Sequence, residues 1–287
     1  MKKVAFLILA IVAFAGCKKE YDPIVPVPPT VTMKFVFDEN QERLDNFGEP
    51  VDVPAGNAAQ APQFNQIAAH YVELIPNENT PLGGGVILYE SPETTAGGDE
   101  AIYFDQLPLL AENEVFDLGL LADIPEGAYR YIRVSLAYQN YTVDYLAQGF
   151  DLTGTLASFI GYNTYITEYT IDEQALAVNS NKLQGYWGFE TVGSVITGQT
   201  PEGAITVPNP LSSTSPIPAG SCLVTGEFET PIVIDYDNPQ DLELTLSLSI
   251  NDSFEWNEVI EDGKWEPGAN ETVVDMGIRG LIGYSNQ

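Results

Sequence analysis

Alternation of apolar and polar residues dominates the chain from residue 31 onward. In the segment 242–250, Leu or Ile occupies every second position, and Glu, Thr or Ser lies between them. The segment 31–38 repeats the pattern, with four apolar residues on one face: Val31, Met33, Phe35 and Phe37. A period of two is typical of half-buried strands, and strict alternation indicates antiparallel sheets with one face dry. We therefore predict an all-β fold, an antiparallel β-sandwich.

Turn signals separate these strand-like runs. Gly-, Pro- and Asn-rich turns are expected at 83–85, 125–127 and 161–163, and Asp262-Gly263 is expected at the tip of a hairpin. No stretch of ten residues has a convincing helical period. Single helical turns fit three short segments: 57–67, 108–114 and 140–148.

The chain is expected to have four parts. These are a leader (1–16), a lipidated cysteine with a tether (17–30), a β-sandwich (31–150) and a second β portion (151–287). The absence of a repeat with a period of 20 to 50 residues argues against propellers and solenoids. One large sandwich and two closely packed β portions both fit the length.

The first residues have the pattern of a bacterial lipoprotein leader. Lys2 and Lys3 precede an apolar run over 4–15, which is shorter than the roughly 20 residues that span a bilayer. Ala15-Gly16-Cys17 resembles a lipobox, with Phe14 in place of the usual Leu. We expect cleavage before Cys17 and acylation of Cys17 with chains such as palmitate, which together anchor a protein stably. The alternative is an ordinary secretory signal with a chance cysteine.

The segment after Cys17 suggests a tether. Four prolines lie between residues 23 and 29, and Pro-rich chains favour extended polyproline II at about 3.1 Å per residue, so residues 18–30 would reach roughly 40 Å. The segment 18–22 resembles, in diluted form, the acid-containing stretch that directs lipoproteins of Bacteroidota to the cell surface. We expect an outer-membrane protein, with the cell surface favoured over the periplasmic leaflet.

Charge and composition exclude two classes. The 287 residues include 41 Asp and Glu against 11 Lys and Arg, a formal net charge of −30. Nucleic acid is therefore not an expected partner, because Lys and Arg supply affinity for phosphate backbones. A hydrophobic content of 44% with 11% aromatic residues is too high for a disordered acidic chain.

Catalytic chemistry has few candidate residues. His70 is the only histidine, and Cys222 is the only cysteine besides Cys17. Both are expected as buried structural side chains. Nucleophilic triads need a base beside the nucleophile, and zinc catalysis usually needs two or three histidines. Carboxylates are plentiful, but no local signature singles out a glycosidase pair. We therefore expect no enzymatic activity.

Calcium is the one cofactor that the composition suggests, because Ca²⁺ prefers hard oxygen ligands. Asp235, Asp237 and Asp241 lie close together at the end of an expected strand. They lack the Gly and Glu positions of an EF-hand, so a solvated acidic turn is the other interpretation. A second acidic cluster contains Glu255, Glu258, Glu261 and Asp262.

Aromatic residues could serve a carbohydrate, because sugars stack on exposed Tyr and Trp rings beside a few placed polar groups. The candidate ligand-binding residues are Tyr162, Tyr186, Trp187, Trp256 and Trp265. Tyr129 and Tyr131 are expected on the wet face of their strand. Aromatic residues that fill a core are the alternative interpretation.

Four segments resemble the β-sandwich lipoproteins and periplasmic proteins grouped as MbnP-like. They are Val31–Phe37, His70–Leu74, Gly85–Tyr89 and Leu121–Arg133, the last close to a PxGxYxxIR strand entry. The resemblance covers roughly residues 31–140 and implies a sandwich fold. Some members of the family bind copper through histidines and a modified tryptophan. In this chain His70 is the only histidine, and no tryptophan precedes Trp187.

These patterns together predict a non-catalytic, lipid-anchored binding module whose partner is a glycan or a protein. Two alternatives remain open: a fimbrial or adhesin-type structural subunit, and a lipoprotein that binds calcium or copper.

The leader interpretation predicts the effect of replacing Cys17. The Cys17→Ser chain should take up no radiolabelled palmitate and should leave the membrane fraction, because it lacks the acylated thiol. Cys222→Ser is the matched control and should keep both label and membrane association. Equal labelling of the Cys17→Ser chain would contradict the lipobox.

Overall fold

A computed structural model of the chain describes residues 27–45, 49–200, 218 and 220–287. The expected leader, Cys17 and most of the expected tether lie outside these residues. The described part consists of strands and loops, with 3-10 turns at η1 (Phe104–Gln106), η2 (Leu121–Asp123) and η3 (Pro267–Ala269) and no α-helix. This confirms the all-β prediction. None of the helical segments in the described part is long and apolar enough to cross a membrane.

The strands follow one another in chain order. They are β1 (Thr30–Asp38), β2 (Asn57–Gln60), β3 (Gln63–Ile75), β4 (Val86–Glu90), β5 (Glu93–Thr94), β6 (Ala101–Tyr103), β7 (Phe116–Leu120), β8 (Gly127–Ala147), β9 (Phe150–Phe159), β10 (Asn163–Thr170), β11 (Ala175–Leu183), β12 (Tyr186–Thr191), β13 (Ser194–Gln199), β14 (Cys222–Ile234), β15 (Leu242–Ser249), β16 (Phe254–Asn257), β17 (Val273–Met276) and β18 (Leu281–Ser285).

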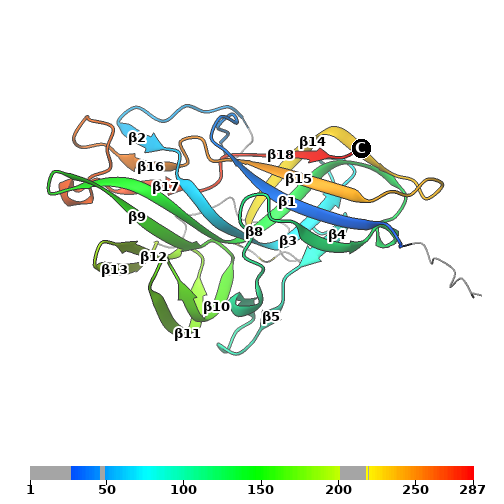
Figure 1. Cartoon of the computed structure of the whole chain (residues 1–287), viewed down its shortest axis with the longest axis horizontal. Helices are drawn as coiled ribbons and strands as arrows, with labels where there is room; N and C mark the ends of the chain where they lie inside the picture. Colours follow the sequence, from blue (N-terminus) through cyan, green and yellow to red (C-terminus); the bar gives the residue numbers. More distant parts are fainter. Residues whose placement is uncertain (1–26, 46–48, 201–217, 219) are drawn as a thin grey trace, which may run out of the picture.

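The 21-residue strand β8 is the spine of the main sheet (Figure 1). On one edge of β8, strand β14 pairs with residues 127–136 and strand β9 pairs with residues 138–147. On the other edge, β3 pairs with residues 131–142. The eleven-stranded sheet runs β13-β12-β9-β8-β14-β18-β15-β1-β7, and β3 and β4 extend it from the free edge of β8.

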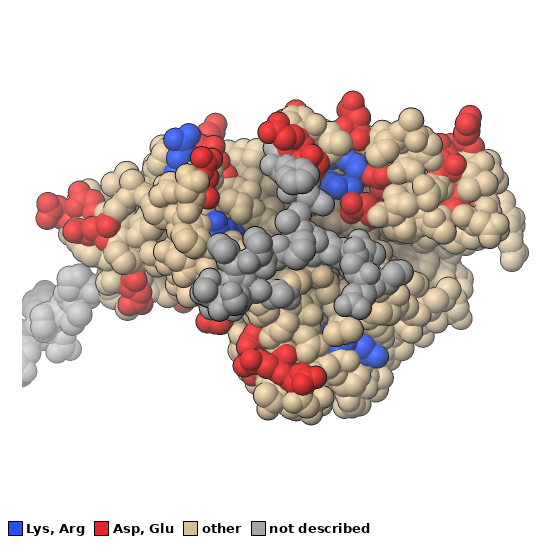
Figure 2. Space-filling view, turned by 180° about the vertical axis from the view of Figure 1, so that it is seen from behind, with Lys and Arg blue, Asp and Glu red and all other residues tan. Residues whose placement is uncertain are grey.

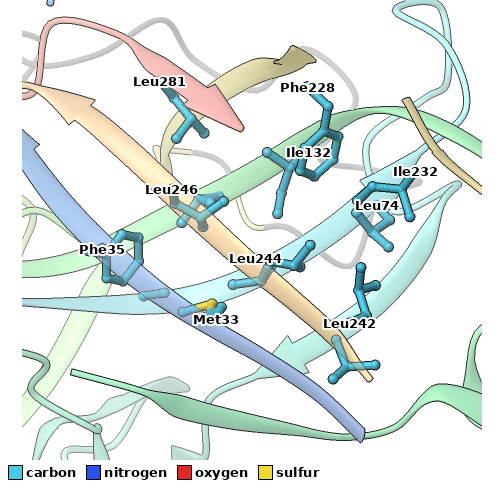
Figure 3. Packing of buried hydrophobic residues seen from close by; sticks show 14 of the residues in the cluster. Met33, Phe35, Leu74, Ile132, Phe228, Ile232, Leu242, Leu244, Leu246 and Leu281 are labelled. Carbon is cyan, nitrogen blue, oxygen red and sulfur yellow. The ribbon is translucent and has the colours of Figure 1, made fainter. Parts of the chain in front are cut away.

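The first half of β8 belongs to a sandwich. Strands β3, β8 and β14 lie on one side of its core, and β18, β15 and β1 lie on the other. Figure 3 shows side chains of β1 and β15, among them Phe35 and Leu244, packed with Leu74 and Ile132 of the facing strands. The alternation in β1 and β15 is confirmed, because their apolar positions are largely buried. These two strands pair in parallel, which departs from the antiparallel expectation.

The second half of β8, with β9 and β12, is covered on both faces by small sheets. The four-stranded sheet β11-β10-β6-β5 packs on one face, and the three-stranded sheet β17-β16-β2 packs on the other. In Figure 1 these two small sheets lie below and above β9. Side chains on both faces of β8 are therefore buried from residue 137 to residue 141, whereas Asp144 further along the strand is exposed.

Several local predictions were wrong. Residues 57–67 and 140–148 are largely extended, within β2, β3 and β8 and the turn after β8, because they pair with β16, β8 and β9. Residues 108–114 form a loop bridged to Ile67 instead of a helical turn. Asp262-Gly263 is not a hairpin tip, since β16 pairs with β17 across a longer connection.

Strands from both expected portions, 31–150 and 151–287, alternate within the main sheet, so no boundary between sheets lies at residue 150.

A buried ion pair explains the triple-glycine turn between β3 and β4. The Glu73 carboxylate is fully buried and lies 3.0 Å from the Arg133 guanidinium. It also accepts the Gly85 backbone N–H at 2.6 Å, while Arg133 donates to the Thr80 carbonyl at 3.1 Å. A Cβ at Gly85 would lie 2.3 Å from the Leu74 carbonyl oxygen. The glycine lets the turn close onto the buried carboxylate.

This pair predicts a contrast between two arginines of β8. Arg133→Ala should lower the free energy of unfolding by about 3–5 kcal/mol, because it leaves the Glu73 carboxylate buried without its counter-ion. Arg130→Ala should change the free energy of unfolding far less, because the Arg130–Glu227 pair is exposed. Urea unfolding of both variants checks the contrast, and equal losses would contradict it.

Candidate functional site

The three-stranded sheet has one dry face and one polar face. Phe254 and Trp256 of β16 point into a core cluster and are almost fully buried. Glu255, between them, points to the opposite face and lies directly across from Asp275 of β17. Asn57 of β2 donates to a Glu255 carboxylate oxygen at 2.5 Å. The alternation of β16 thus gathers two carboxylates and an amide on the polar face.

Two arginines compensate these carboxylates. Arg43, 7% exposed, comes from the segment after β1; it pairs with Glu255 and donates to the Asp252 carbonyl at 2.6 Å. Arg279 lies 2.7 Å from Asp275 and 3.4 Å from Glu255. Like charges directly opposite on two strands repel, so the two guanidinium groups are needed to stabilise the Glu255 and Asp275 carboxylates in neighbouring positions. The Nε atoms of both arginines are buried and have no hydrogen-bond partner in the described part of the chain.

Two adjoining hollows open at this network. The first has a volume of about 220 Å³ and is lined by Glu42, Arg43, Val51, Asp52, Asn251 and Asp252, among others. The second has a volume of about 290 Å³ and shares Arg43, Val51 and Asp52 with the first. It also reaches Asn57, Glu255, Asp275 and Arg279. We call the two together the Arg43 hollow. It offers strong hydrogen-bond donors and acceptors side by side.

The Arg43 hollow carries an excess of negative charge. Its two arginines are matched by Glu255 and Asp275, and the carboxylates of Glu42, Asp52 and Asp252 add to these. Figure 2 shows that Asp and Glu also outnumber Lys and Arg over one face of the molecule. This field disfavours anionic ligands.

The predicted tryptophans gather elsewhere, in the core between β9, β12 and the three-stranded sheet. Trp256 is fully buried, so it is not available for stacking on a sugar at the surface. Trp265 is partly buried against Phe254, with ring centroids 4.9 Å apart, and donates from its indole to the Glu271 carbonyl. Trp187 is partly buried in the same cluster and lies against Gly198, where a Cβ would meet its ring at 2.4 Å. Core filling explains all three.

The predicted tyrosines also have structural contacts. Tyr186 is buried in the cluster on the opposite face of β12. Tyr162 is partly buried and donates to Glu93 at 2.8 Å. The prediction that Tyr129 lies on a solvent-exposed face is wrong, because Tyr129 is buried. Its hydroxyl group donates to the Pro125 carbonyl at 2.9 Å. Tyr129 is buried because it belongs to the sandwich core cluster, while Tyr131 is partly exposed.

His70 is buried, as expected, whereas Cys222 is only partly buried. His70 is 2% exposed, and its Nε2 atom lies 3.1 Å from a Glu93 carboxylate oxygen, which ties β3 to β5. Cys222 forms no disulfide. Burial raises the pKa of its thiol to about 12, with a smaller contribution from Asp275. At neutral pH the thiol therefore stays protonated and unreactive.

The acidic residues proposed for calcium do not form a ligand set. Asp235 accepts the Asp237 backbone N–H at 2.9 Å, and Asp241 accepts the Thr30 backbone N–H at 2.8 Å. Among the residues that the structure describes, no three His, Cys, Asp or Glu side chains gather in a way that could hold a metal ion. The second acidic cluster is also divided, since Glu255 faces the Arg43 hollow and Glu258 accepts the Gly263 N–H.

Sequence reasoning missed most of the Arg43 hollow. Its polar residues come from four separate segments, around residues 43, 57, 255 and 275–279. Only Glu255 had been singled out, within an acidic cluster. The available signal was the presence of Arg43 and Arg279 in a chain with only 11 basic residues.

Comparison of the chain with protein-family models, with curated proteins and with solved structures found no match in any of the three. The function must therefore be argued from the residues and their geometry.

Glu271 holds the loop that carries Trp265. Its carboxylate accepts the backbone N–H groups of Val259 at 2.9 Å, Ile260 at 3.1 Å and Glu266 at 2.6 Å. Burial alone would raise the pKa of this carboxyl, but the three donors outweigh burial and hold the pKa below its usual value of 4.5.

This lowered pKa gives the loop a pH-dependent contribution to stability. Glu271→Gln should cost about 1–3 kcal/mol at pH 7, because an amide cannot accept all three hydrogen bonds. The advantage of the native carboxylate is complete above pH 4.5 and is lost as the pH falls through the lowered pKa. Urea unfolding at pH 7 and pH 3 measures the difference, with exposed Glu261→Gln as control. If the difference in unfolding free energy between the native and Glu271→Gln chains is larger at pH 3 than at pH 7, the lowered pKa of Glu271 is contradicted.

Proposed function

We propose that the chain is a non-catalytic, lipid-anchored outer-membrane lipoprotein that binds a ligand in the Arg43 hollow. The observation that carries the proposal is the convergence of fixed donors and acceptors in that hollow. Arg43 and Glu255 are both buried and are held by several bonds, so little side-chain entropy is lost when a ligand binds.

The position of the first strand supports a display role. Strand β1 begins at one end of the molecule, and the three-stranded sheet with the Arg43 hollow lies towards the opposite end (Figure 1). Acyl chains on Cys17 and a Pro-rich tether would attach the end where β1 begins. The hollow would then face away from the membrane, towards a glycan or protein partner.

The ion pairs favour binding over catalysis. Glu255 and Asp275 are the two carboxylates that lie opposite each other beside the hollow, and both are engaged by arginines. Either group would have to leave an ion pair before it could transfer a proton as a general acid or base. Fixed ion pairs instead suit a site that recognises a ligand without changing it.

One observation favours the alternative of a structural subunit. Strand β13 lies at the end of the main sheet and pairs only with β12 in the described part of the chain. Ile196 on this strand and Val192 in the turn before it are 55% and 81% exposed. An open edge can accept a strand from another copy. A strictly monomeric protein in light scattering would remove this alternative.

A ligand survey with a positional readout tests the proposed function. The full mature protein in detergent micelles is screened by thermal shift against neutral glycans, acidic glycans, basic peptides and acidic peptides. At least one class should raise the melting temperature and should slow hydrogen exchange in residues 49–57 and 251–255. The proposal is overturned when no class binds, or when the ligands that bind protect only other segments.

A further inference from the structure

We infer that the Arg43 hollow accepts two consecutive units of a neutral, polyhydroxylated ligand, that is, a carbohydrate chain without acidic groups. This inference rests on the proposed function, because it names the ligand class of the same site. It differs from the expectation drawn from the sequence, in which aromatic rings would have held the sugar.

The pairing of donors with acceptors points to hydroxyl groups. The side chains of Arg43 and Asn251 line the first hollow, and their remaining N–H groups are donors beside the hydrogen bonds that they already make to Asp252 and Gln41. Asp52 and Glu42 supply carboxylate oxygens around the same hollow. A hydroxyl group donates one hydrogen bond and accepts two, so adjacent hydroxyls of one sugar ring can satisfy both kinds of group. A simple anion satisfies only donors, and a simple ammonium satisfies only acceptors.

The charge of the lining residues further restricts the class of ligand. Arg43 and Arg279 already have carboxylate partners, so they retain little attraction for a second anion. The additional carboxylates of Glu42, Asp52 and Asp252 repel an acidic sugar. A cation would be drawn to these carboxylates, but it would also meet the guanidinium group of Arg43, which lines both hollows. A neutral ligand avoids both conflicts.

Size and apolar lining agree with a short stretch of a sugar chain. Volumes of about 220 and 290 Å³ lie below the roughly 300–1,000 Å³ of pockets that enclose drug-sized ligands. Each hollow thus suits one small unit, and the shared Arg43, Val51 and Asp52 connect the two units. Val51, Pro54 and Val274 offer apolar contact for C–H groups. Among the residues that the structure describes, no aromatic ring lines either hollow.

Calorimetry with matched oligosaccharides tests the inference. The full mature protein in detergent micelles is titrated with glucose, maltose, maltotriose, cellotriose and trigalacturonate. At least one of the neutral sugars should bind. Within its series, the affinity should rise from the monosaccharide to the disaccharide and should change less than threefold from the disaccharide to the trisaccharide. Trigalacturonate should bind at least tenfold more weakly than the best neutral trisaccharide.

Two substitutions at Asp52, which is exposed and lines both hollows, separate hydrogen bonding from charge. Asp52→Ala should weaken binding of the neutral ligand at least tenfold. Asp52→Asn should stay within threefold for the neutral ligand and should improve trigalacturonate binding. Asp123→Ala, an exposed acid on η2, is the control and should change nothing. Unchanged melting temperatures show that the variants fold.

Three results would overturn the inference. They are equal binding of trigalacturonate, neutral binding that survives Asp52→Ala, and no binding of any neutral sugar. If a basic peptide instead protects residues 49–57 and 251–255 from hydrogen exchange, the ligand class is wrong but the proposed function stands. If nothing protects these segments, both fail.

Discussion

Strand β8 has partner strands on both edges between residues 131 and 142 and buried side chains on both faces between residues 132 and 141, and the rest of the fold follows from this requirement. Strands β14 and β9 divide one edge between them, while β3 takes the other. The first half of β8 contributes to the sandwich core. The second half needs cover on two faces, which the two small sheets provide. The three-stranded sheet, and with it the Arg43 hollow, is therefore present because β8 extends beyond the sandwich.

The excess of acidic over basic residues determines how buried carboxylates are satisfied. With few arginines or lysines available, several carboxylates accept backbone N–H groups instead. Glu190, 8% exposed, accepts the N–H groups of residues 172–174, and Glu271 does the same for three residues of its loop. Each one fixes a loop without a counter-ion. Against this background, two arginines on neighbouring carboxylates at the Arg43 hollow are a concentrated use of a scarce residue type.

The sequence predicted what depends on local alternation and missed what depends on distant contacts. Strands β1 and β15 were predictable, because one face of each is buried and the other is polar. The extended form of residues 140–148 was not, because it depends on pairing with β3 and β9, and because the polar residue Asn140 is buried there. The burial of Trp256 could not be predicted, because the cluster that covers it contains residues from the distant strands β8, β9 and β12. The Arg43 hollow was unpredictable for the same reason.

The central claim is that the Arg43 hollow binds a neutral sugar chain, and the side-chain Nε–H signals of Arg43 and Arg279 report on it most directly. Both groups lack a hydrogen-bond partner in the described part of the chain, so a change in their surroundings should move their resonances. Nuclear magnetic resonance during titration with a neutral trisaccharide should shift both signals together with the backbone amides of residues 49–57. Saturable binding that leaves these signals in place and shifts the indole signals of Trp187 and Trp265 would contradict the account.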